Sequence, residues 1–86
     1  MYTIAFSDLA RKQLHKLSKE IQIRIISVLE RIRIRPEAYV MKLVGDPGYR
    51  LRVGDYRVII DLDKDKLFIL VLKVGHRRNI YDMASV

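Results

Sequence analysis

A change of hydrophobic period part-way along the chain constrains the fold more than any other feature. Between residues 9 and 32 the apolar residues recur at helical spacing, and between residues 49 and 60 they alternate with polar ones, as in strands with one buried face. The clearest helical stripe consists of Ile21, Ile25, Val28, Leu29 and Ile32. Helical and alternating patterns in separate segments predict the α+β class, in which helices cover a sheet.

Two helices are predicted before the change of period. Ser7 and Ser18 are of the residue type that caps helix N-termini, and an amphipathic segment follows each of them. Pro36 disfavours a helical conformation at the residue before it, so the second helix should end just before Arg35. Tyr2–Phe6 has the character of a short strand. The first half of the chain is therefore expected to be a strand followed by an αα-hairpin.

Three strands are predicted after an irregular segment at Pro36–Gly48. Gly54-Asp55 suits a two-residue hairpin turn with glycine at its first central position, so the alternating runs on either side should pair. A second turn, centred on Lys64 and Asp65, leads to Leu67–Val74. This run is apolar at nearly every position, which is typical of a central strand.

The expected order is β-α-α-β-β-β, with the N-terminal strand and the αα-hairpin packed on one face of a largely antiparallel four-stranded sheet. The 86 residues allow one domain, taken as residues 1–86, and half of them are hydrophobic, which permits a small core. No run approaches the roughly 20 apolar residues of a membrane span, and the N-terminus does not have the pattern of a signal peptide. A cytoplasmic protein is expected.

Composition restricts the chemistry. The chain has no cysteine, which excludes disulfides and thiolate sites, and its two histidines, His15 and His76, are far apart, so neither a metal nor a cofactor is expected. The net charge of +7 favours a polyanionic partner: nucleic acid, the ribosome or an acidic protein.

The hairpin turn predicts a cluster of arginines. If Gly54-Asp55 is the turn, Arg52 faces Arg57 across the strand pair, and Arg50 lies on the same face. Like charges directly opposite each other destabilise a strand pair, so the arrangement suggests an anion that the arginines receive. Guanidinium binds phosphate through two parallel hydrogen bonds. The alternative is that these arginines form only a solvated surface.

The same register predicts what joins this cluster. A turn at Lys64 and Asp65 would place Arg57 beside Leu72, so that the last strand ends near the Gly54 turn. His76 and Arg77 could then reach the arginines, with Tyr81 following. The register also places further apolar residues on the arginine face, either as core under a terminal segment or as a docking patch. These residues are Phe68, Leu70 and Leu72.

Two motifs carry a resemblance that spans most of the chain. The first is Tyr49-Arg50-Leu51-Arg52-Val53-Gly54-Asp55-Tyr56-Arg57-Val58, and the second is Val74-Gly75-His76-Arg77 followed by Tyr81. With Ala5-Phe6 and Leu14-x-x-Leu17 nearer the N-terminus, they resemble the RelE/ParE toxin superfamily of type II toxin-antitoxin systems, most closely the RelE branch.

The resemblance implies a metal-independent endoribonuclease without a cofactor. RelE-like toxins enter the ribosomal A site and cut mRNA there, by attack of a ribose 2′-hydroxyl that leaves a cyclic phosphate and a free 5′-hydroxyl. A cognate antitoxin wraps the toxin and silences it. The expected partners are thus the antitoxin, mRNA and the ribosome, and no membrane.

The resemblance also assigns roles. The family's basic residues match Arg50, Arg52, Arg57 and Arg77, and its C-terminal tyrosine matches Tyr81. Arg57 suits stabilisation of the transition-state charge, Arg77 suits the leaving-group side, and Tyr81 suits stacking on or orienting a base.

Arg50 and Arg52 depart from the best-known members, which have lysines at these positions. Guanidinium gives up a proton less readily than an amine, so neither arginine is a good general base. His76 as a backup base, Tyr81, or positioning by the ribosome are the alternatives for this step.

Two other functions stay open. A ParE-type toxin shares the fold but inhibits DNA gyrase by binding it. A non-catalytic RNA-binding module would bind in a salt-dependent way without cleavage.

Overall fold

A computed structural model describes residues 1–80 of the chain. Its elements follow the expected order with two additions, a short 3-10 helix and an extra strand. They are β1 (Thr3–Phe6), α1 (Asp8–His15), α2 (Lys19–Ile32), η1 (Pro36–Ala38), β2 (Val40–Lys42), β3 (Tyr49–Val53), β4 (Tyr56–Asp63) and β5 (Phe68–His76).

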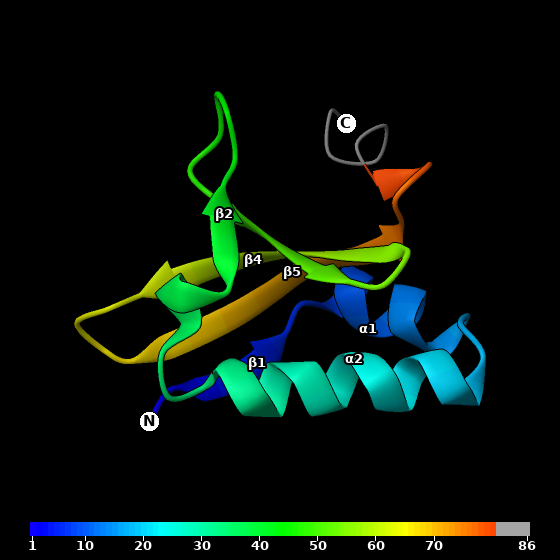
Figure 1. Ribbon diagram of the computed structural model, residues 1–86, viewed down its shortest axis with the longest axis horizontal. Coiled ribbons are helices and arrows are strands. Elements are labelled where there is room, and N and C mark those ends of the chain that lie inside the picture. Colours follow the sequence, from blue (N-terminus) through cyan, green and yellow to red (C-terminus); the bar gives the residue numbers. More distant parts are fainter. Residues whose placement is uncertain (81–86) are drawn as a thin grey trace.

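The strands form one five-stranded sheet in the order β1-β5-β4-β3-β2 (Figure 1). β1 runs parallel to β5, and the other neighbouring pairs are antiparallel. The α+β class is confirmed, but the expectation of four strands is wrong by one, β2. This strand has only three residues, which is too short to show an alternating pattern within a segment expected to be irregular.

Both helices begin where the capping serines predict. The Ser7 hydroxyl accepts a hydrogen bond from the Ala10 amide at 3.0 Å, and the Ser18 hydroxyl accepts one from the Ile21 amide at 3.3 Å. α2 ends at Ile32, before the proline that starts η1. None of the helices in the described range is long and apolar enough to cross a membrane.

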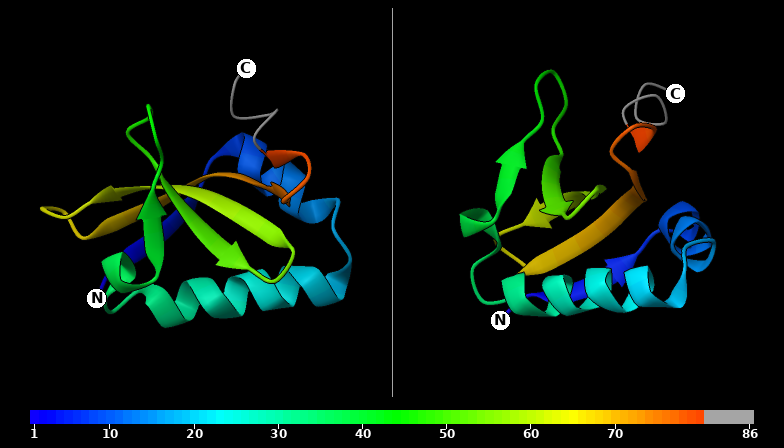
Figure 2. Two further views of the ribbon diagram at one scale, coloured as in Figure 1. Left: turned by 45° about the horizontal axis from the view of Figure 1, so that its top comes forward. Right: turned by 45° about the vertical axis from the view of Figure 1, so that its right-hand side comes forward.

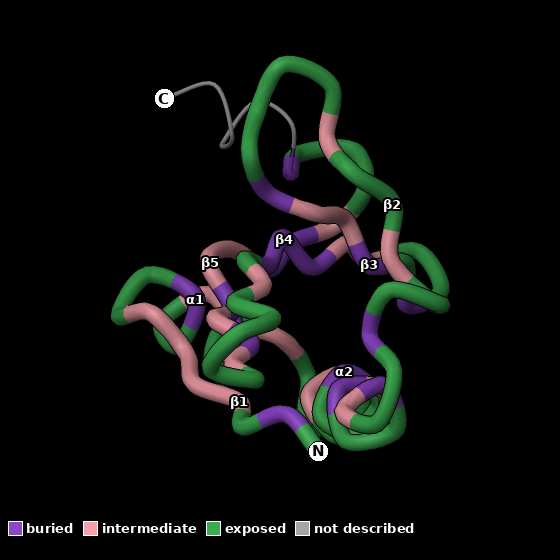
Figure 3. The backbone as a smooth tube through the Cα atoms, turned by 90° about the vertical axis from the view of Figure 1, so that its left-hand side faces the viewer, coloured by how far each residue is buried: buried purple, intermediate pink, exposed green. Residues whose placement is uncertain are grey.

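The helices cover one face of the sheet, as the two views of Figure 2 show. Buried residues recur along α2 and the central strands, coloured purple in Figure 3. Within residues 1–80, every buried side chain of the core is apolar. The core cluster consists of Tyr2, Ala10, Leu14, Ile25, Leu29, Ile32, Leu51, Val53, Val58, Ile60, Ile69, Val71 and Val74. The opposite face of the sheet is left free for the charged residues of β3 and β4.

The turn between β4 and β5 is wider than expected. It contains residues 64–67 rather than two residues, so Asp63 pairs with Phe68. The Asp63 carboxylate accepts hydrogen bonds from the amides of Asp65 and Lys66, at 3.1 and 3.0 Å. These bonds satisfy two backbone amides of the wider turn.

A β-bulge further along shifts the register again. The irregularity lies at Ile59 and Ile60, and beyond it Arg57 pairs with Gly75 instead of the expected Leu72. A bulge adds one residue to a strand, and it therefore reverses the alternation of faces beyond it. Residues near the end of β5 consequently lie on the face opposite to the one that strict alternation predicts.

Candidate functional site

The β3–β4 hairpin brings its arginines to the face of the sheet away from the helices. The core-facing residues of this hairpin include Leu51, Val53 and Val58. Side chains alternate along a strand, so Arg50, Arg52 and Arg57 take the other face. Arg52 lies opposite Arg57 in the register, as expected, and the intervening turn has Gly54 at a φ of 58°, which glycine adopts without steric cost.

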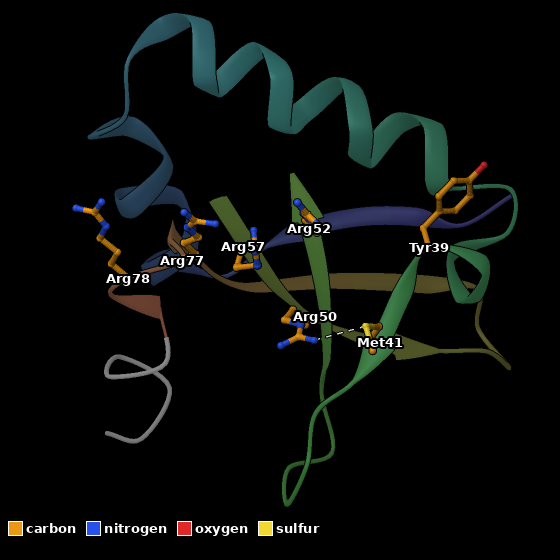
Figure 4. A pocket seen from close by; sticks show the side chains of 7 residues that line it. All are labelled: Tyr39, Met41, Arg50, Arg52, Arg57, Arg77 and Arg78. Atoms are coloured by element: carbon orange, nitrogen blue, oxygen red, sulfur yellow. Dashed lines mark hydrogen bonds between the residues drawn. The ribbon is translucent and has the colours of Figure 1, made fainter. Parts of the chain in front are cut away.

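These arginines line a depression of about 700 Å³ at one end of that face (Figure 4). None of its lining residues is acidic. The lining residues are Tyr39, Met41, Arg50, Arg52, Arg57, Arg77 and Arg78. In Figure 4 the guanidinium groups of Arg78, Arg77, Arg57 and Arg52 follow one another, with Tyr39 at the far end. Such a concentration of guanidinium groups without a carboxylate in the lining is suited to a polyanion.

The turn orients two of the arginines. Arg57 Nη1 donates to the carbonyl oxygens of Gly54 and Tyr56, both at 2.9 Å. The Arg77 amide donates a hydrogen bond to the Asp55 carbonyl at 2.8 Å. This bond holds the chain after β5 against the hairpin turn. Arg77 Nη1 also lies 4.0 Å from Asp55 Oδ1, but both side chains are more than half exposed, so this ion pair is weak.

Arg50 and Arg52 differ in how they are held. Arg50 Nη2 donates to Met41 Sδ at 3.5 Å, across the β2–β3 pair in which Met41 is the register partner of Arg50. Within residues 1–80, Arg52 has no ion pair, and it faces the like charge of Arg57. A bound anion would therefore relieve the repulsion between Arg52 and Arg57.

His76 does not line the arginine depression. Its ring packs edge-on against Tyr56, with centroids 5.3 Å apart, and both residues border a different hollow next to α1. The bulge in β5 explains the difference, because it moves His76 to the helix side of the sheet. The expectation that His76 reaches the arginine cluster is wrong. His76 Nδ1 instead accepts a hydrogen bond from the Arg78 amide at 3.2 Å.

Three lining residues were not among the sequence candidates, and Tyr81 lies outside the described residues. Arg78 follows Arg77 directly in the sequence, and the path of the chain after β5 brings both side chains into the lining of the depression. Tyr39 and Met41 enter through β2, whose pairing with β3 was not visible in the sequence. The alternation of apolar and polar residues that marks a strand is weak in β2, because only Val40 of this strand packs against the core.

The apolar candidates lie further along β5. Phe68 and Leu70 pair with Asp63 and Asp61, at the end of the strand remote from the Gly54 turn. Each of the three is half-buried, and Leu72 lines a small hollow beside Ile59. These three side chains are therefore partly covered, and Phe68 and Leu70 lie remote from the Gly54 turn.

Comparisons with known proteins identify the family. Residues 4–81 match the family described as the ParE toxin of the type II toxin-antitoxin system parDE. The chain belongs to this toxin family.

Relatives and solved structures agree with this assignment. Toxin RelG of Mycobacterium tuberculosis is 29% identical to this toxin in an alignment of 84 positions that covers 93% of this chain and 95% of RelG. A chain of the RelBE2 toxin-antitoxin complex of M. tuberculosis superposes with a TM-score of 0.82 at 26% identity, covering 88% of this chain and 98% of that one. The isolated RelE toxin of E. coli gives a TM-score of 0.75 at 26% identity, covering 99% and 96%.

The fold of the toxin is thus that of RelE, and the protein is a toxin of the RelE/ParE superfamily from a type II toxin-antitoxin system. Structures of the RelE-RelB complex from Pyrococcus horikoshii match as well, with a TM-score of 0.72 at 28% identity over 88% of this chain and 94% of that one.

Proposed function

We propose that this toxin is a metal-independent endoribonuclease that cleaves mRNA in the ribosomal A site, in the cytoplasm. The observation that carries the proposal is the depression in which Arg50, Arg52, Arg57, Arg77 and Arg78 converge. An arginine-lined hollow binds the phosphate of a strand through charge-assisted hydrogen bonds. The resemblance to RelE toxins, which cut mRNA, supplies the reaction.

The reaction is an in-line displacement at phosphorus. The ribose 2′-hydroxyl gives its proton to an acceptor and attacks the adjacent phosphorus, and the bond to the 5′-oxygen breaks as this oxygen takes up a proton from solvent. The products are a 2′,3′-cyclic phosphate and a free 5′-hydroxyl. Negative charge builds up on the phosphoryl oxygens in the transition state, where fixed cations stabilise it more than they stabilise the ground state.

Arg57 is best placed to stabilise this charge. Two backbone carbonyls hold its Nη1, so the guanidinium is oriented before the substrate arrives and loses little freedom on binding. Arg77 and Arg78 lie next to it after the end of β5 and suit the leaving 5′-oxygen. Arg50 and Arg52 then bind the RNA strand at the β3 side of the depression.

The proton acceptor is not a histidine of the depression, because His76 borders a different hollow. Arginine holds its proton at neutral pH, so Arg50 and Arg52 serve to bind and polarise rather than to remove the proton. We propose Tyr81 as the group that accepts the proton, while positioning of the RNA by the ribosome raises the rate of the step.

Primer extension on mRNA from a translating extract tests the proposal. Addition of the toxin should produce new 5′ ends within codons, and these ends should disappear when the ribosomes are removed. Intact message together with arrested growth would contradict the ribonuclease function.

A second candidate is inhibition of DNA gyrase, and the match to the ParE family favours it. Such a toxin would act by binding alone, and the arginines would then contact protein or DNA. Inhibited supercoiling by purified gyrase, with message left intact, would support this function over cleavage.

We further propose that a cognate antitoxin silences the toxin by covering the depression. The support is the set of RelE complexes with RelB that share this fold. An antitoxin segment with carboxylates would pair with the arginines, and its apolar residues would pack near Phe68, Leu70 and Leu72.

A further inference from the structure

Tyr39 lies at the end of the row of arginines that lines the depression, and its side chain is exposed to solvent. It follows η1 directly and precedes β2, whose register pairs Val40 with Leu51 and Met41 with Arg50. Val40 packs toward the core, so Met41 after it alternates to the arginine face. Tyr39 itself has a helical backbone conformation (φ −117°, ψ −14°), and it lines the depression beyond Arg52, as Figure 4 shows.

The ring of Tyr39 is free to receive a planar ligand. The residue is 51% exposed, and within residues 1–80 its side chain makes no hydrogen bond and no ring contact. Met41 on the same face is 62% exposed, and its sulfur accepts the hydrogen bond from Arg50. An aromatic ring and a thioether thus form the apolar end of a hollow that is otherwise lined by guanidinium groups.

This combination matches a nucleotide in particular. A nucleotide joins an anionic phosphate to a flat base, and single-stranded RNA is read by stacking its bases on aromatic side chains while basic residues follow the backbone. The hollow, at about 700 Å³, is within the roughly 300–1,000 Å³ range of ligand sites. A site for a free phosphate alone would have no use for the two apolar side chains.

We propose that Tyr39 stacks on one base of the bound RNA strand, with Met41 beside it, and so helps to determine which nucleotide is presented for cleavage. The proposal rests on the ribonuclease function proposed above and adds to it a base-binding subsite. Stacking needs only the ring and is tolerant of base identity. Tyr39 therefore sets the register of the strand relative to the arginines more than it selects a sequence.

The test uses ribosomes programmed with end-labelled message that carries a single abasic nucleotide at each codon position in turn. Cleavage rates are measured on gels for the unmodified toxin, Tyr39→Ala and Tyr39→Phe. Ile23→Ala is the matched control, since this residue is a large apolar side chain that is 58% exposed on α2, away from the hollow. Circular dichroism confirms that each variant is folded.

On intact message Tyr39→Ala should slow cleavage by about 5- to 150-fold, the effect of losing one stack of a base on an aromatic ring. Tyr39→Phe and Ile23→Ala should cleave at close to the unmodified rate. At one codon position, loss of the base should slow the unmodified toxin by a similar factor and should slow Tyr39→Ala no further. Such non-additivity identifies the two groups as contact partners.

Other outcomes overturn the proposal. Additive losses at all three positions, or full activity of Tyr39→Ala, would show that Tyr39 does not stack on the message. Unchanged cleavage with weakened inhibition by the antitoxin would assign Tyr39 to the protein partner instead. If the unmodified toxin cuts none of the messages, the ribonuclease function itself fails and the subsite with it. Cleavage that is insensitive to Tyr39→Ala removes the subsite alone.

Discussion

At the scale of single residues, local geometry decided which candidates the sequence could place. Arg50, Arg52 and Arg57 belong to one tight hairpin, and a two-residue turn with glycine at positive φ fixes their register directly. Arg77 follows because β5 ends beside that turn. His76 was misplaced because a bulge leaves no clear trace in the sequence, yet it reverses the face of every later residue in the strand.

Arg57→Ala and Arg77→Ala should each abolish growth arrest without unfolding the toxin. Removal of a fixed donor to a developing oxyanion typically costs about 10²- to 10³-fold in rate, or about 2.7–4 kcal/mol. Growth after induction and single-turnover cleavage on ribosomes are the measurements. Arg31→Ala is the matched control, because Arg31 is an exposed arginine in the last turn of α2. Full toxicity of both depression variants would disprove the site.

Arg52→Lys should retain or increase cleavage, since an amine gives up a proton more readily than a guanidinium and keeps the positive charge.

His76→Ala should lower the cleavage rate by less than about tenfold, because the hydrogen bond that His76 accepts from the Arg78 amide only positions the backbone. Cleavage rates on programmed ribosomes test both. A loss of several hundredfold for His76→Ala, with none for changes at Arg52, would make His76 the base after all.

At the scale of elements, the sequence predicted those with a strong local signal. The caps at Ser7 and Ser18 and the proline after α2 placed both helices. β2 was not predicted because three residues are too few to show a periodicity. It forms a strand through its pairing with β3. The two apolar or aromatic side chains of the depression were missed for the same reason.

Ser7 connects α1 to the sheet as well as capping it. Its hydroxyl accepts from the Ala10 amide and donates to the Leu72 carbonyl at 2.9 Å. Ser7→Ala removes both bonds and should lower the free energy of unfolding by about 1.5–3 kcal/mol, whereas a cap alone typically contributes about 1 kcal/mol. Ser18→Ala is the matched control, since its hydroxyl only caps α2 and is exposed. Denaturant titrations should give a clearly larger loss for Ser7→Ala, and equal losses would show that the bond to Leu72 contributes nothing.

At the scale of the whole molecule, charge and apolar surface are separated along one face of the sheet. The arginine depression lies at the Gly54 end of the hairpin, and the half-buried apolar residues of β5 lie toward the other end, beside Asp61 and Asp63. A protein partner that covers the whole face must therefore offer carboxylates at one end and apolar side chains at the other.

Hydrogen exchange on the toxin, with and without its cognate antitoxin, should show protection at residues 50–57 and 68–72. Binding should weaken partly as salt is raised, because the charge pairs are screened while the apolar contacts are not. Variants Arg50→Ala and Arg52→Ala should reduce the salt dependence. Protection restricted to α1 and α2 would mean that the antitoxin does not cover the depression, and inhibition would then arise from exclusion of the toxin from the ribosome.

The parallel pairing of β1 with β5 has a consequence for how the protein is made. β1 is an edge strand whose only neighbour is β5, and Ser7 at its end is bonded to a carbonyl 65 residues further along. The ends of such a long loop close slowly, since the entropy of closure must be lost before any contact compensates for it. A nascent chain that stops before Phe68 has no strand with which β1 can pair, so β1 joins the sheet only after β5 has been synthesised. A copy of this toxin still emerging from a ribosome therefore cannot complete its sheet until Phe68–His76 has been synthesised.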